Sequence, residues 1–261
     1  MTKGKKSRYQ AALEARQAAE AEAVASAPTP LTDDERSSGL LVVDGLAKDY
    51  GDLVALQTTF LSVPPGQSVA LVGHNGSGKS TLLRIVAGLL DPSDGSATVE
   101  GAAVGSSEAR AATSFIPDEP VLFDDLSVRE HLEYVSAVHG APATEADIDE
   151  LVGRLGLAGR VDDLPARFSR GLRQKAGLAV GLVRPFSLLL IDEPFVGLDA
   201  TGRDALLVLL DEASAAGATL VIATHEPSFV ERVDRCVALR DGRIVHDGPA
   251  VAADVLRLVG A

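Results

Sequence analysis

The residues best suited to chemistry in this 261-residue chain are Gly-His-Asn-Gly-Ser-Gly-Lys-Ser, at positions 73–80. The glycines let the backbone curl so that successive N–H groups point at one centre, which suits the oxygens of a phosphate. Lys79 would reach the terminal phosphates of a nucleotide, and Ser80 would place its hydroxyl on a magnesium ion. A glycine-rich turn without a ligand is the alternative, and the restrictive spacing favours a phosphate-binding loop. We expect nucleotide contacts from Gly73, His74, Asn75, Gly76, Ser77, Gly78, Lys79, Ser80 and Thr81.

Two regular elements must hold this loop in place. The apolar run 68–72 is typical of a buried strand, and the periodic run 81–87 predicts a helix. The N-terminus of that helix would add its partial positive charge to the loop.

A second group of polar residues follows another apolar run, Leu-Leu-Leu-Ile at 188–191, where Asp192 and Glu193 come next. In a parallel sheet the carboxyl ends of the strands border the ligand crevice, so both acids would lie beside the phosphate loop. Asp192 could then hold the magnesium. Glu193 could accept a proton from an attacking water, which typically contributes about 10²–10⁴ in rate. An apolar strand that ends in acids is common, and only the upstream loop favours this function.

The segment 167–175 is a polar, glycine-containing turn that opens a helix ending near residue 183. Ser169 is placed to cap this helix, and a capped helix N-terminus can bind an anion. The turn taken alone is more typical of an ordinary helix cap.

The rest of the chain predicts an α/β protein with a distinct N-terminal part. Residues 1–38 predict a mobile extension and linker, because an Ala- and Glu-rich stretch is followed by Pro28 and Pro30. Strands are expected at 40–43, within 54–63, and at 96–100, 113–116, 218–223, 236–239 and 243–245. Helices are expected from Ser127, from Thr144 and over 201–213, 228–233 and 251–259, with a hairpin turn at Asp241-Gly242.

Composition restricts the partners of the chain. The net charge of −13 argues against a surface that coats nucleic acid, so we expect no nucleic-acid partner. The basic cluster Lys3, Lys5, Lys6 and Arg8 could contact anionic lipid or only solvate a tail, and we favour the tail. The apolar run 176–183 is too short to cross a bilayer, so a membrane role would be peripheral. The single cysteine, Cys236, suits a reducing compartment and a buried position.

Taken together, these motifs resemble the ABC-type ATPases. The phosphate loop, Phe168-Ser169-Arg170-Gly171-Leu172, the strand ending in Asp192-Glu193, Gly197-Leu198-Asp199 and His225 follow one another in the order typical of that family. The resemblance covers residues 40–248. It implies a P-loop NTPase of the ABC ATPase type over 39–261, with a mixed central sheet, an antiparallel β subdomain and an inserted helical subdomain at about 120–183.

The resemblance also implies an ATP site shared by two chains. ATP would lie between the phosphate loop of one ATPase subunit and the turn of a second, where Ser169 and Gly171 would contact the γ-phosphate. Tyr50 matches the aromatic residue that stacks on adenine, and Asp199 matches a loop linking the two sites. His225 matches a histidine that contacts the γ-phosphate.

Two segments depart from the family pattern. Asp118 stands where a glutamine usually contacts the magnesium and the attacking water, and we expect it to act in catalysis and at the metal. Arg170 and Leu172 stand where glycine and glutamine are commonest. Pro117-Asp118-Glu119-Pro120 together with 168–175 is most similar to the subunits that energise ABC-2-type exporters.

We therefore expect an ATPase that uses ATP and Mg²⁺, dimerises on ATP and energises a separate integral membrane permease, as an exporter. It would be cytoplasmic and peripheral on the cytoplasmic face of the plasma membrane. The alternatives are a non-transport ABC ATPase that acts on soluble protein or ribosomal partners, and a nucleotide-gated scaffold without catalysis. The sequence leaves open the cargo and the choice between homodimer and heterodimer.

Overall fold

The structure is a computed structural model that describes residues 28–249, and the fold below is that of the compact unit beginning at Leu31. Most of the predicted extension, residues 1–27, and the predicted helix 251–259 lie outside the described residues.

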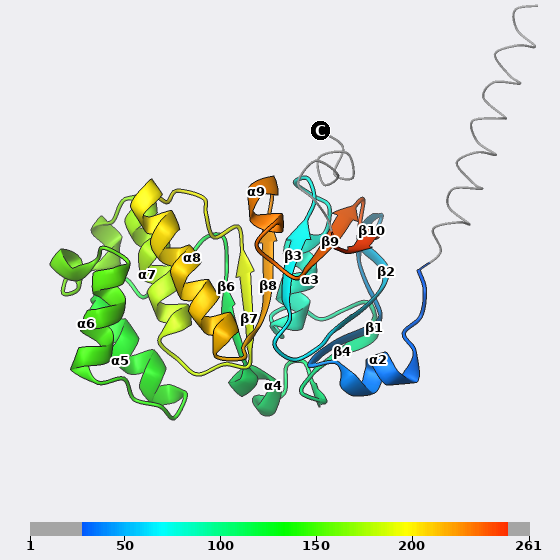
Figure 1. The fold of residues 1–261 in the computed structure, drawn as a ribbon, viewed down its shortest axis with the longest axis horizontal. Coiled ribbons are helices and arrows are strands. Elements are labelled where there is room, and N and C mark those ends of the chain that lie inside the picture. Colours follow the sequence, from blue (N-terminus) through cyan, green and yellow to red (C-terminus); the bar gives the residue numbers. More distant parts are fainter. Residues whose placement is uncertain (1–27, 250–261) are drawn as a thin grey trace, which may run out of the picture. The chain divides into compact units, whose positions relative to one another are not determined.

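A six-stranded sheet forms the centre of this unit (Figure 1), with the strand order β10-β9-β3-β8-β7-β6. Neighbouring strands from β9 to β6 run parallel, whereas β10 pairs antiparallel with β9, so the expected mixed sheet is confirmed. Its strands are β3 Ser68–Val72, β6 Thr113–Ile116, β7 Leu188–Asp192, β8 Thr219–Thr224, β9 Arg235–Arg240 and β10 Arg243–Gly248.

A second sheet is antiparallel and has the order β2-β1-β4-β5, which confirms the expected β subdomain. Its strands are β1 Leu41–Tyr50, β2 Leu53–Val63, β4 Asp94–Val99 and β5 Ala102–Ala103. β1 continues well beyond the predicted strand 40–43, because it pairs with β2 on one side and β4 on the other.

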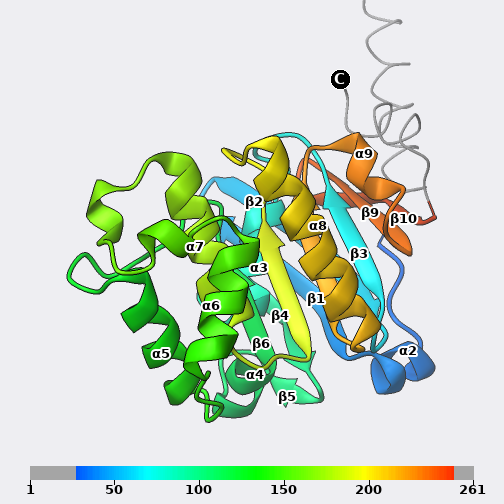
Figure 2. The same cartoon turned by 60° about the vertical axis from the view of Figure 1, so that its left-hand side comes forward.

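The helices α5 Val128–Val138, α6 Glu145–Arg154 and α7 Arg170–Leu182 come between β6 and β7 in the chain and gather on the β6 side of the large sheet (Figures 1 and 2). Ser127 and Thr144 form the predicted capping boxes of α5 and α6. The other helices are α2 Asp33–Ser38, α3 Lys79–Val86, α4 Ser107–Ala112, α8 Ala200–Ala215 and α9 Pro227–Val230, with short 3-10 helices at Ala158–Arg160 and Pro165–Arg167.

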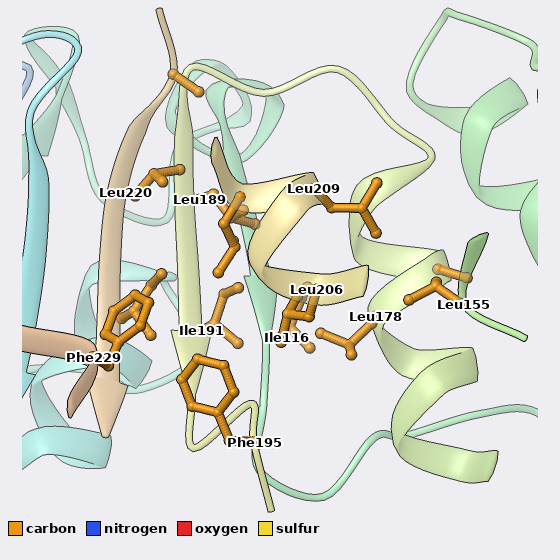
Figure 3. Packing of buried hydrophobic residues seen from close by; sticks show 14 of the residues in the cluster. Ile116, Leu155, Leu178, Leu189, Ile191, Phe195, Leu206, Leu209, Leu220 and Phe229 are labelled. Carbon is orange, nitrogen blue, oxygen red and sulfur yellow. The ribbon is translucent and has the colours of Figure 1, made fainter. Parts of the chain in front are cut away.

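The strands of the large sheet alternate between two hydrophobic cores. Leu189 and Ile191 of β7 face α7 and α8, as Figure 3 shows, whereas Leu188 and Leu190 join the core on the side of α3 and the antiparallel sheet. A strand that is buried on both faces needs a continuous apolar sequence, which explains the run Leu-Leu-Leu-Ile.

Helix α2 lies within the range 1–38 that was predicted as an extension and linker. Thr32 and Glu35 form a capping box, Ser62 donates to the Glu35 carbonyl at 2.7 Å, and Arg36 pairs with Asp44 at 2.9 Å. These contacts tie the helix to β1 and β2, so the structure differs from the prediction here. A six-residue helix has little stability of its own, which is why sequence periodicity did not reveal it.

Candidate functional site

The loop 73–80 connects β3 to α3, and two of its glycines have no room for a side chain. A Cβ on Gly73 would lie 2.4 Å from the Leu239 carbonyl oxygen. Gly78 has a φ of +105°, and its Cβ would lie 2.8 Å from the Ala55 carbonyl oxygen. These positions therefore require glycine to let the loop pass close to β2 and β9.

The turn between β9 and β10 supports the loop from one side. Gly242 donates its N–H to the Ser77 carbonyl at 3.0 Å, and its own carbonyl accepts from Gln57 at 2.8 Å. Asp241 and Gly242 both have positive φ, 51° and 76°, as expected for the predicted hairpin turn. The sequence predicted this hairpin but carried no signal of its contact with the loop.

The order of the parallel strands brings the predicted polar residues to one edge of the sheet. Gly73, His225, Glu193 and Asp118 follow or lie just beyond the carboxyl ends of β3, β8, β7 and β6, which are consecutive neighbours. Residues separated by more than a hundred positions in the chain thus lie at the same edge of the sheet, where ligands of such sheets usually bind.

Lys79, Glu193 and His225 are in direct contact at this edge. Lys79 is buried, donates from Nζ to the Gly73 carbonyl at 2.8 Å, and lies 3.6 Å from Glu193 Oε1. Glu193 Oε2 lies 2.8 Å from His225 Nδ1 and accepts the His225 backbone N–H at 3.2 Å. Glu193 has a φ of +49°, an uncommon conformation for a residue with a side chain, and its N–H is held by the Ala223 carbonyl.

Asp192 is the buried carboxylate of the site. Burial is the main cause that raises its pKa; the Ser80 hydroxyl and Lys79 act in the opposite direction, and the carboxylates of Glu193 and Asp118 add to the rise. Its Oδ1 is buried and has no hydrogen-bond partner.

An oxygen set of this kind fits Mg²⁺. The Asp192 Oδ1 without a partner, the Ser80 hydroxyl and the Asp118 carboxylate are hard oxygen donors, which this ion prefers. Within residues 28–249, no three His, Cys, Asp or Glu side chains converge as a metal site. Mg²⁺ commonly takes one or two carboxylates and completes its shell with substrate phosphates and water.

Three of the remaining predicted site residues, Ser169, Gly171 and Tyr50, make their described contacts outside the loop 73–80. Ser169 caps α7 by accepting the Leu172 N–H at 3.4 Å, and a Cβ on Gly171 would meet the Gly197 carbonyl at 2.6 Å. Tyr50 ends β1 rather than lying in a loop, and the Lys48 ammonium stands 5.0 Å from the centre of its ring. Among the described residues, no hydrogen bond or ion pair joins Ser169, Gly171 or Tyr50 to residues 73–80.

Asp118 and Arg170, which both depart from the family pattern, face one another. Arg170 Nη2 lies 4.0 Å from Asp118 Oδ1, and the aliphatic part of Arg170 packs beside Gly197. Asp199 caps α8 and pairs with Lys175 of α7 at 3.0 Å, and this contact is the first cause that lowers the pKa of Asp199. Sequence spacing did not indicate either pair, since both join distant elements.

A protein-family model described as ABC transporter matches residues 56–196. The chain belongs to the ABC transporter family. A solved ATP-binding subunit of an ABC transporter is 33% identical, has a TM-score of 0.75 and is matched over 85% of our chain and 95% of its own. Its P-loop fold and its activity as an ATPase follow from this membership, as does nucleotide binding.

Curated ABC relatives with known directions of transport are also similar. The SkfA peptide export ATP-binding protein SkfE of Bacillus subtilis is 32% identical, over 80% of our chain and 88% of SkfE. The aliphatic sulfonates import ATP-binding protein SsuB of Albidiferax ferrireducens is 38% identical, over 79% of our chain and 73% of SsuB. In the described part of this ABC chain, no helix is both long enough and apolar enough to span a membrane.

Proposed function

We propose that this ABC ATPase hydrolyses ATP at the edge formed by Lys79, Asp192, Glu193 and His225, and thereby drives a separate membrane permease that exports its cargo. The observation that carries the proposal is the convergence of these four side chains, with one Asp192 oxygen buried and free of partners.

Each side chain has a role that its contacts suggest. Backbone N–H groups of 73–80 would surround the phosphates, and Lys79 would exchange its contact with Glu193 for the terminal phosphate. Glu193 would then accept a proton from the attacking water, with its carboxylate oriented by the His225 backbone and ring. Ser80, Asp192 and Asp118 would hold Mg²⁺, which neutralises charge on the β- and γ-phosphates when bound.

The site needs a second ATPase chain for completion. Ser169 and Gly171 are predicted phosphate contacts, yet neither is bonded to the loop of its own chain. A second copy or a sister chain would supply them in trans, and Tyr50 would stack on the adenine from its exposed place at the end of β1.

The permease would dock on an apolar patch made by Val121, Phe123, Tyr134 and Val138, which are all exposed. The Phe123 and Tyr134 rings pack edge to face, so the segment after β6 and helix α5 contribute to one surface. Large exposed apolar patches commonly mark interaction sites.

A chain bound to such a permease would lie at the cytoplasmic face of the plasma membrane. Export is favoured by the combination of 117–120 with 168–175.

Hydrolysis is tested by the Glu193→Gln variant. We expect turnover of Mg-ATP to fall by about 10²–10⁴, because the amide cannot accept the proton. Glu231→Gln, at an exposed position beyond α9, is the control and should keep wild-type turnover. ATP binding without turnover in the wild-type protein would support the scaffold interpretation instead.

Docking is tested by co-purification with membranes of the native host. Val121→Asp combined with Phe123→Ser should abolish recovery of an integral membrane protein, because it places charge and polarity in the patch. Leu89→Ser, at an exposed apolar residue after α3, is the matched control. Unchanged recovery with the double variant would exclude this patch as the permease contact.

A further inference from the structure

The contact between Asp118 and Arg170 joins the segment just beyond the carboxyl end of β6 to the N-terminus of α7. The two groups approach to 4.0 Å, which is an ion pair but too long for a hydrogen bond. Asp118 Oδ1 is buried and has no hydrogen-bond partner, whereas 67% of the Arg170 side chain is exposed. The arginine is therefore loosely held, and most of its side chain is exposed to solvent.

The backbones on both sides of this pair are fixed by close packing. A Cβ on Gly177 would lie 2.5 Å from Pro120, and one on Gly181 would lie 2.3 Å from Ile116. The segment 116–120 is thus packed tightly along α7. A change in the Asp118–Arg170 contact would then come from the long arginine side chain rather than from movement of the helix.

The local charges explain why Arg170 is attracted to this place and why it could leave. Asp118, Glu193 and the buried Asp192 are close enough for both neighbours to raise the pKa of Asp192, and Lys79 is the buried cation among them. The first turn of α7 has no acidic residue, so an arginine there adds to the positive end of the helix. An anion that approaches the helix N-terminus would therefore interact favourably with both the arginine and the helix dipole.

We propose that Arg170 is a positioning residue that alternates between two anions: Asp118 of its own chain, and the terminal phosphate of a nucleoside triphosphate bound to a second ATPase chain. When Arg170 moves from Asp118 to the phosphate, it strengthens the triphosphate-dependent dimer. Asp118 is then free to act at the proposed Mg²⁺ site of its own chain. This inference rests on the shared site proposed above.

The test uses the full chain with Glu193→Gln, so that ATP persists, and measures the dimer dissociation constant by analytical ultracentrifugation in Mg-ATP. Arg170→Ala should weaken the dimer at least tenfold, and Arg170→Lys should restore most of this loss. Asp118→Asn should tighten the dimer several-fold, because it removes the competing anion. Arg160→Ala is the control for lost positive charge, since Arg160 makes only a local pair with Asp163.

The opposite signs expected for the two variants separate positioning from a merely structural role. The proposed alternation of Arg170 is wrong if Asp118→Asn weakens the dimer as Arg170→Ala does, or if Arg170→Ala leaves the dimer unchanged. Neither result contradicts the shared ATP site. If the parent Glu193→Gln protein stays monomeric in Mg-ATP, the shared site itself fails and this inference fails with it. Circular dichroism of each variant distinguishes a loss of folding from a loss of the contact.

Discussion

Asp192 is a residue at which function works against stability. It is 2% exposed, and burial raises the pKa of its carboxyl, so the folded chain holds this proton more tightly than the unfolded chain does. The free energy of unfolding therefore falls as the pH rises from the ordinary value of 3.8 through the raised pKa of the folded state.

We predict that Asp192→Asn stabilises the fold while it reduces hydrolysis. The amide removes the buried charge, so the melting temperature should exceed that of the wild type at pH 8, and the difference should shrink toward pH 4. Thermal unfolding across this pH range measures the effect, and Mg-ATP turnover should fall at least tenfold. A variant less stable than the wild type at pH 8 would show that the charge is compensated in the folded state.

Cys236 is buried in β9, as the sequence led us to expect, and burial raises the pKa of its thiol to about 11. We predict very slow alkylation of the native protein by iodoacetamide at pH 8, because only about 0.1% of such thiols are ionised. Unfolding in urea should make the reaction fast. Mass spectrometry of the two samples measures the difference, and rapid labelling of the native chain would contradict the burial.

At the scale of elements, close packing constrains the glycines of α7. A Cβ on Gly177 would lie only 2.5 Å from Pro120, so a side chain there would force a shift of its neighbours. A Cβ on Gly153 in α6 would have open space around it, with no neighbouring atom within 4 Å. The two helical glycines therefore differ only in what surrounds them.

We predict opposite effects of alanine at these two positions. Gly177→Ala should lower the free energy of unfolding by about 1–3 kcal/mol, because overpacking outweighs the gain in helix propensity. Gly153→Ala should raise it by about 0.5–1 kcal/mol, because only propensity changes there. Urea unfolding measures both values. Stabilisation by both substitutions would mean that Pro120 yields without cost.

At the scale of the whole molecule, the net charge of −13 bears on how the chain reaches a membrane. We predict that the purified chain does not sediment with anionic lipid vesicles at 0.15 M salt. Acidic side chains are repelled by the lipid, and the four basic residues at 3–8 contribute only about 1 kcal/mol each. Vesicles that contain the permease should capture it. Binding to lipid alone would revive the lipid-contact interpretation of the basic cluster.

The sequence by itself determined the family, the fold class and the elements with strong local signals. The loop 73–80, the apolar strands at 68–72 and 188–191, and the caps at Ser127 and Thr144 each carry their information within a few residues. Local steric preference and hydrogen bonding set these features, so spacing was enough to predict them. Helix α2 and the full length of β1 escaped because contacts with other strands, rather than their own sequence patterns, stabilise them.

Only the tertiary structure decided which residues meet. The Glu193–His225 contact, the Gly242 support of Ser77 and the Asp118–Arg170 pair each join positions far apart in the chain. The strand order β10-β9-β3-β8-β7-β6 brings the first two pairs together, and the packing of α7 beside β6 brings the third. That arrangement depends on burial of both sheet faces rather than on any local pattern. The physical reason is that side-chain chemistry is encoded residue by residue, whereas proximity results from packing of the whole unit.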